Sequence, residues 1–261
     1  MTRAALILGV AFLWAPVLLL CGYAFSGGRE PFVWGGFSLR WFAALAGNER
    51  LLEAAWLSLR VAAGAATLAM VLGGAAGWVL ARHGRFRGRA LFGALAGAPL
   101  ILPEVVLGLA LLLGFVALQS FTGWPAQRGA ATVLLAHATL GLAYVTVVVQ
   151  ARVAALDPRL EEAALGLGAS PWAAFRTVTL PLIAPSLAGG WLLAFILSLD
   201  DVVLASFVSG PGGTTLPVFL FSQLRMGMTP EGNALAVVAL VIALAIAGTG
   251  LAGLAWWRRR A

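Results

Sequence analysis

Three carboxylates interrupt otherwise apolar stretches of this chain, and their chemistry is the easiest to interpret. Glu104 follows Pro103 inside one apolar run, and Asp200 and Asp201 lie side by side in another. An ionisable side chain inside a membrane is costly and commonly lines a transport path, where a carboxylate attracts a cation and repels an anion. The alternative is structural, because each acid could instead tie neighbouring helices together.

Helix geometry limits what the aspartate pair can do. Adjacent positions of a helix point about 100° apart, so Asp200 and Asp201 cannot both face one cavity unless the helix unwinds near them. Aromatic faces also stabilise ammonium groups, which makes Tyr144 and Trp191 weaker candidates for a cation path, with packing as the alternative. His137 lies among apolar neighbours in the sequence, without clustered His, Cys or acidic residues, so we expect no metal site.

Long apolar segments must position these side chains. Of the 261 residues, 61% are hydrophobic and only 10% are charged, a composition that favours a bilayer over water. Helices pair their backbone groups internally, and the 32 glycines suit close helix packing. We predict an all-α membrane protein with a single transmembrane domain over 1–261 and six helices long enough to cross roughly 30 Å of hydrocarbon, at about 4–25, 56–81, 90–118, 130–151, 185–208 and 233–257.

The arginines predict how these spans are oriented. All 17 basic residues are arginines, and eleven of them fall on one side of the predicted bundle, mainly in the 82–89 loop and the C-terminal tail. The positive-inside rule makes that side cytoplasmic and places both termini there. The net charge of +7 could also suggest nucleic acid. These arginines, however, flank spans singly or in short runs, which suits topology and anionic headgroups better.

A polar segment over 157–181 separates the fourth and fifth predicted spans. It should hold two short helices, because a capping side chain followed by proline occurs twice, as Asp157 with Pro158 and as Ser170 with Pro171. The first helix should run through Leu167 and end at Gly168, and Leu180 with Pro181 should close the loop before the next span. Two short helices at an angle suit insertion into a groove on a partner protein.

The same segment resembles the E-A-A-x3-G-x9-I-x-L-P loop of bacterial ABC importer permeases. Val178 replaces the usual isoleucine, and the matching residues are Glu162, Ala163, Ala164, Gly168, Leu180 and Pro181. The resemblance implies a type I ABC importer permease fold in the bacterial inner membrane. It also implies that 157–181 is a cytoplasmic coupling loop that docks onto an ATPase subunit, with Glu162 as the main coupling candidate.

The chain contains no G-x4-G-K-[ST] sequence to cradle phosphates. We therefore expect a transport subunit that is not an enzyme and holds no cofactor, with ATP and magnesium bound by a partner ATPase. An intramembrane aspartyl protease would need two opposed aspartates on separate helices. Asp200 and Asp201 are neighbours on one predicted helix and do not meet that requirement.

Three later segments, 198–203, 206–217 and 225–231, are similar to the polyamine importer permeases, and most like the permease of putrescine systems. The resemblance implies import of putrescine or a related polyamine. The implied partners are a second homologous permease, two ATPase subunits and a periplasmic binding protein. Permeases of the same architecture that carry amino acids, sulfate or iron are the alternative, because they share the E-A-A loop.

Overall fold

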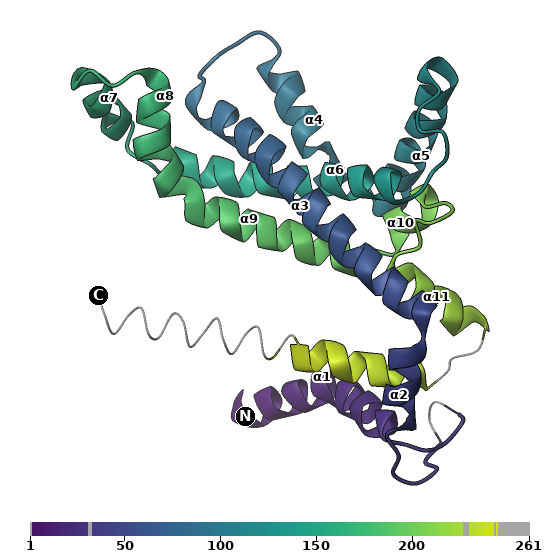
Figure 1. The fold of residues 1–261 in the computed structure, drawn as a ribbon. Coiled ribbons are helices and arrows are strands. Elements are labelled where there is room, and N and C mark those ends of the chain that lie inside the picture. The colour runs from purple at the N-terminus through teal and green to yellow at the C-terminus, as the bar shows by residue number, and fades with distance from the viewer. Residues whose placement is uncertain (1, 31–32, 227–229, 243, 245–261) are drawn as a thin grey trace. The chain divides into compact units, whose positions relative to one another are not determined.

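The computed structural model describes residues 2–30, 33–226, 230–242 and 244, and most of them are helical (Figure 1). Five helices in this part of the chain are long and apolar enough to cross a membrane. They are Ala5–Ala24, Glu49–Arg82, Glu104–Thr122, Ala130–Ala154 and Pro171–Asp200. Most of the expected sixth span and the terminal arginines lie outside the described residues, so six spans and two cytoplasmic termini stay predictions.

The chain forms two compact units, Met1–Leu52 with Leu220–Ala261, and Glu53–Phe219. The first holds α1 (Thr2–Ala24), α2 (Arg40–Gly47) and a shorter apolar helix, Glu231–Ile242. Its 25–38 loop is organised by Ser26, whose Oγ accepts hydrogen bonds from the backbone of Gly28 (3.1 Å) and Gly35 (2.9 Å). The single transmembrane domain expected over 1–261 stays a prediction.

The second unit is built around two long helices, α6 (Ala130–Ala154) and α9 (Leu180–Asp200), packed against each other and against α3 (Glu49–Arg82). Small residues on α3 allow α6 to approach closely. A Cβ added at Gly73 would lie 2.6 Å from the carbonyl oxygen of Leu142, and one added at Gly77 would lie 2.6 Å from that of Thr146. The expectation that glycines serve helix packing is confirmed at these two positions.

Two of the predicted spans are broken rather than continuous. The predicted helix over 90–118 is wrong in this respect, because the structure has α4 (Arg89–Ile101) and α5 (Glu104–Thr122) instead. Leu102 between them is extended, with φ −74° and ψ 136°, the conformation that a following proline imposes on its neighbour. The predicted helix over 185–208 likewise divides into α9 and α10 (Val203–Val208), and α11 (Leu216–Met226) follows.

The contact of α3 with α6 yields a test of the fold. Gly77→Ala would place a methyl group against backbone atoms that cannot rotate away, and overpacking of this kind costs about 1–3 kcal/mol. We expect a lower melting temperature for the purified protein in detergent. Gly114→Ala on α5 is the matched control, since an added Cβ there meets nothing within 4 Å. Equal melting temperatures for the two variants would contradict the packing.

Candidate functional site

The two short helices of the 157–181 segment form as predicted. In α7 (Arg159–Gly166) the first turn is capped by Asp157, whose Oδ1 accepts a hydrogen bond of 3.0 Å from the backbone of Arg159. Gly168 follows with φ +87°, a left-handed conformation that glycine adopts without strain. Ser170 Oγ then caps α8 (Pro171–Ala174) by accepting from the backbone of Ala173 at 3.2 Å.

The end of this segment differs from the prediction. Leu180 and Pro181 do not close a loop before the fifth span, because α8 continues through a π-helical turn, Phe175–Thr179, directly into α9. Proline lacks an amide hydrogen and crowds the carbonyl four residues before it. A wider turn just ahead of Pro181 relieves that crowding, which gives a physical reason for the π turn. The fifth span therefore begins earlier than residue 185.

The side chains of the expected coupling residues are mostly accessible. Glu162, Ala163, Gly168 and Pro181 are exposed, Leu180 is 36% exposed, and Ala164 is half-buried. The neighbouring Glu161 behaves differently. Its Oε1 lies 3.3 Å from Nε of Arg82 at the end of α3 and accepts a hydrogen bond from Thr179 Oγ1.

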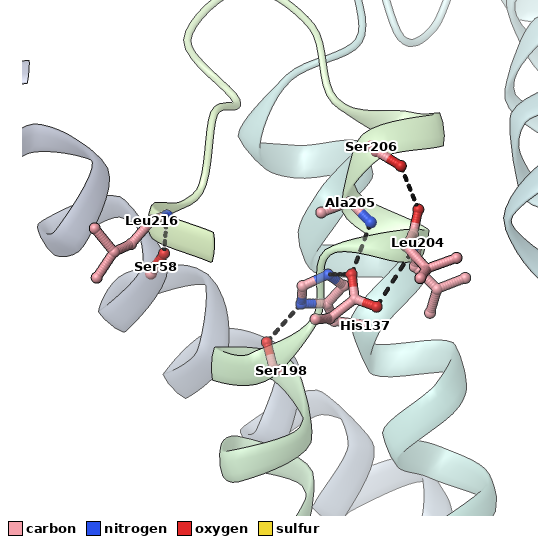
Figure 2. Close-up of polar contacts among 9 residues, drawn as sticks. Ser58, His137, Ser198, Leu204, Ala205, Ser206 and Leu216 are labelled. Carbon is pink, nitrogen blue, oxygen red and sulfur yellow. Dashed lines mark hydrogen bonds and ion pairs between the residues drawn. The ribbon is translucent and has the colours of Figure 1, made fainter. Parts of the chain in front are cut away.

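A second polar site lies where the fifth span breaks. Helix α9 ends at Asp200, and Asp201 is extended with φ −71° and ψ 127°. The Asp201 carboxylate then caps α10, because Oδ1 accepts from the backbone of Leu204 at 3.2 Å and Oδ2 from that of Ala205 at 2.7 Å (Figure 2). The unwinding that would free the two aspartates from a common helix is present.

The interpretation that His137 has no acidic partner is wrong, because Asp201 lies beside it. It extends from α6 toward the break, with Nε2 3.1 Å from Asp201 Oδ2 and Nδ1 2.6 Å from Ser198 Oγ (Figure 2). The side chains of His137 and Asp201 are only 1% and 5% exposed. An ionised Asp201 can only accept, so a neutral imidazole would donate from Nε2 and accept from Ser198 at Nδ1.

This geometry gives the predicted acids different surroundings. Asp201 commits both oxygens to protein groups and is buried, which favours the structural alternative for this residue. Asp200 and Glu104 are exposed, the first at the end of α9 and the second in the first turn of α5. Helices α5 and α10, which begin just after the two breaks, pack against each other and against α6 through Leu107, Leu140 and Leu204.

The two aromatic candidates are engaged in packing. Tyr144 is half-buried against the same leucine cluster. Trp191 stacks on Phe195 with ring centroids 5.1 Å apart and donates a hydrogen bond of 3.1 Å to Thr67 Oγ1. Within the part of the chain that the structure describes, no group of three His, Cys, Asp or Glu side chains is arranged to hold a metal ion.

A family model described as "Binding-protein-dependent transport system inner membrane component" matches residues 73–256. The chain belongs to this family. It is a multi-pass protein of the bacterial inner membrane, in agreement with the apolar helices described above.

Curated relatives match this permease over most of its length. The putrescine transport system permease protein PotI of Escherichia coli strain K12 is 50% identical over 252 residues, 97% of this chain and 88% of the relative. The spermidine/putrescine transport system permease protein PotC of Haemophilus influenzae is 40% identical over 237 residues, 90% of this chain and 89% of the relative. A solved bacterial ABC transporter that imports the acidic polysaccharide alginate shares the fold, with a TM-score of 0.69, 16% identity and 95% of both chains covered.

Several polar contacts in this permease could not be predicted from the sequence. His137, Ser198, Glu161 and Thr179 each act through a contact with a residue far away in the sequence, and hydropathy patterns carry no signal for such pairs. One signal was available, because a histidine in an apolar span needs a hydrogen-bonding partner. That partner could have been sought among the acids of the other spans.

The polar site at the break predicts that the two aspartates differ in their effect on stability. Asp201→Asn should weaken the contact with His137 and the cap of α10, and a buried group left unsatisfied costs about 1–3 kcal/mol. We therefore expect a clear fall in the melting temperature of the purified permease in detergent. Asp200→Asn is the control and should melt close to the unsubstituted protein. A stable Asp201→Asn variant would show that the cap does not hold the break together.

Proposed function

We propose that this chain is one of two homologous permease subunits of an ATP-driven importer, and that it carries putrescine or a related polyamine across the inner membrane. The observation that supports this most strongly is the 50% identity to a putrescine permease over 97% of the chain. The fold, shared with a solved ABC transporter at a TM-score of 0.69, is consistent with it. The chain takes part in transport and has no covalent chemistry to perform.

A separate ATPase pair supplies the energy in this proposal. ATP and magnesium belong to those subunits, and this chain needs no cofactor of its own. The exposed residues of the 157–181 segment, Glu162 and Gly168 among them, form the surface that docks onto the ATPase on the cytoplasmic side. A periplasmic binding protein delivers the solute at the opposite face.

The substrate's chemistry fits the exposed acids at the broken spans. A polyamine is a chain of ammonium groups and needs anionic or aromatic surroundings to cross an apolar barrier. Transporters commonly build substrate sites from interrupted helices, and Asp200 and Glu104 both lie beside such interruptions. We assign them to the substrate path, whereas Asp201 holds the path's shape.

Uptake by the reconstituted importer tests the function. Proteoliposomes would contain this permease with its co-expressed permease partner and ATPase, with ATP enclosed and binding protein outside. We expect labelled putrescine or spermidine to accumulate with ATP, and a labelled amino acid control to stay outside. Accumulation of the amino acid alone would support a permease for another solute.

Asp200→Asn tests the assignment of the path in the same assay. We expect the KM for the polyamine to rise roughly tenfold, as the loss of about 1.4 kcal/mol of binding would produce. Glu104→Gln should act in the same direction. An unchanged KM in both variants would remove these two acids from the substrate path, while uptake by the unsubstituted protein would leave the proposed function intact.

A further inference from the structure

Two adjacent glutamates of α7 face different surroundings. Glu162, which belongs to the E-A-A pattern, is exposed, whereas the side chain of Glu161 is only 25% exposed. Glu162 is thus available to a partner protein. Glu161 is instead directed toward the permease's own helices, where it contacts Arg82 and Thr179.

Glu161 takes part in a junction of four segments. Its Oε1 pairs with Nε of Arg82 at the end of α3 and accepts from Thr179 Oγ1 at the start of the fifth span. Arg82 also donates from Nη1 to the carbonyl oxygen of Leu156, just beyond α6, at 3.3 Å. We name this cluster of Arg82, Leu156, Glu161 and Thr179 the Glu161 junction.

Thr179 shows that the junction is more than a local helix contact. Several other threonines in helices of this permease donate to the carbonyl oxygen four residues earlier, as Thr146 does to Leu142 and Thr177 does to Ala173, both at 2.7 Å. Thr179 is only 1% exposed and donates to Glu161, 18 residues away. It is the last residue of the π turn that leads into α9, so the bond connects α7 to the base of the fifth span.

The surroundings of the Glu161 junction are mainly apolar and offer few other hydrogen bonds between α7 and the neighbouring helices. A largely apolar cavity of about 670 Å³ lies among α3, α7, α8 and α9, with Trp78, Trp172 and Phe175 in its lining beside Glu161 and Thr179. The contact of Trp78 with Phe175, at 5.3 Å between centroids, is an edge-to-face ring contact and not a hydrogen bond. Among the described residues, only Glu161 joins the α7 helix to α3 and to the π turn by side-chain hydrogen bonds.

We propose that Glu161 is a positioning residue that transmits movement of the coupling helix α7 to α3 and α9, whereas Glu162 serves docking. The inference rests on the proposed function, since the movement in question is the one that the ATPase imposes. A charged hydrogen-bonded pair is directional and resists rotation of α7 relative to the spans. Loss of Glu161 would therefore leave the ATPase attached while its closure no longer moves the spans.

The experiment compares Glu161→Ala with Glu162→Ala in the complete importer. ATPase retention is measured by co-purification, and coupling is measured as the stimulation of ATPase activity and uptake by the loaded binding protein. We expect Glu161→Ala to retain the ATPase but to lose stimulation by on the order of tenfold, within the usual range of coupling between sites. We expect Glu162→Ala to lose the ATPase itself.

Two further variants guard against a simple failure of folding. Thr179→Val keeps the shape of the side chain but removes the donor, so it should lower stimulation without loss of the ATPase. Glu161→Gln keeps an accepting oxygen for Thr179 and should restore part of the stimulation that Glu161→Ala loses. A merely structural role would not produce this graded recovery at equal amounts of assembled complex.

The possible results separate the inference from the function on which it rests. Full stimulation in both Glu161→Ala and Thr179→Val, or equal loss of the ATPase from Glu161→Ala and Glu162→Ala, would overturn the role of Glu161 while the unsubstituted complex still transports. No ATP-driven uptake by the unsubstituted complex, in the presence of assembled ATPase, would overturn the proposed function and the inference together.

Discussion

In a bilayer, the backbone groups exposed by a break in a helix must be paired inside the protein, because lipid offers no partner. The six-residue helix α10 shows how this permease meets that constraint. Its first turn is capped by Asp201, and its last carbonyl, that of Val208, accepts from Thr132 Oγ1 of α6 at 2.7 Å. His137, also on α6, holds Asp201 in place. One long helix therefore pairs directly with the C-terminal end of α10 and holds the side chain that caps its N-terminal end.

The pairing of the break has a consequence for the neighbouring acids. A carboxylate that caps a helix and contacts a buried histidine would have to give up those bonds to bind a cation. Among the described residues, the Asp200 carboxylate makes no such helix-capping or histidine contact, so it can face a polar path. Glu104 is intermediate in this sense, because it lies in the first turn of α5, where the positive end of the helix dipole favours an acid without any bound cation.

The sequence predicts local features of this permease far better than its distant contacts. Caps, a left-handed glycine and the apolar stretches depend on residues within a few positions of one another, so both limits of α7 and the start of α8 were predicted closely, whereas the continuation of α8 into α9 was not. His137 lies 64 residues from Asp201, and Arg82 lies 79 residues from Glu161. Only folding brings these pairs together, and hydropathy alone does not reveal them. The break before Glu104 could have been predicted from the sequence, because Pro103 disfavours a helical backbone conformation at Leu102.

Helix α9 connects the two polar sites physically. It runs from the π turn beside Thr179 to Asp200, and its 21 residues extend about 30 Å at 1.5 Å per residue. Small residues hold it close to α6: a Cβ added at Gly141 would lie 3.0 Å from the Cβ of Ala194. Pro185, inside α9, cannot donate a backbone hydrogen bond, so this packing against α6 is needed to keep the helix aligned. In the proposed mechanism, a displacement at the Glu161 junction would reach the break at Asp200 through this helix, because α9 is continuous from Leu180 to Asp200.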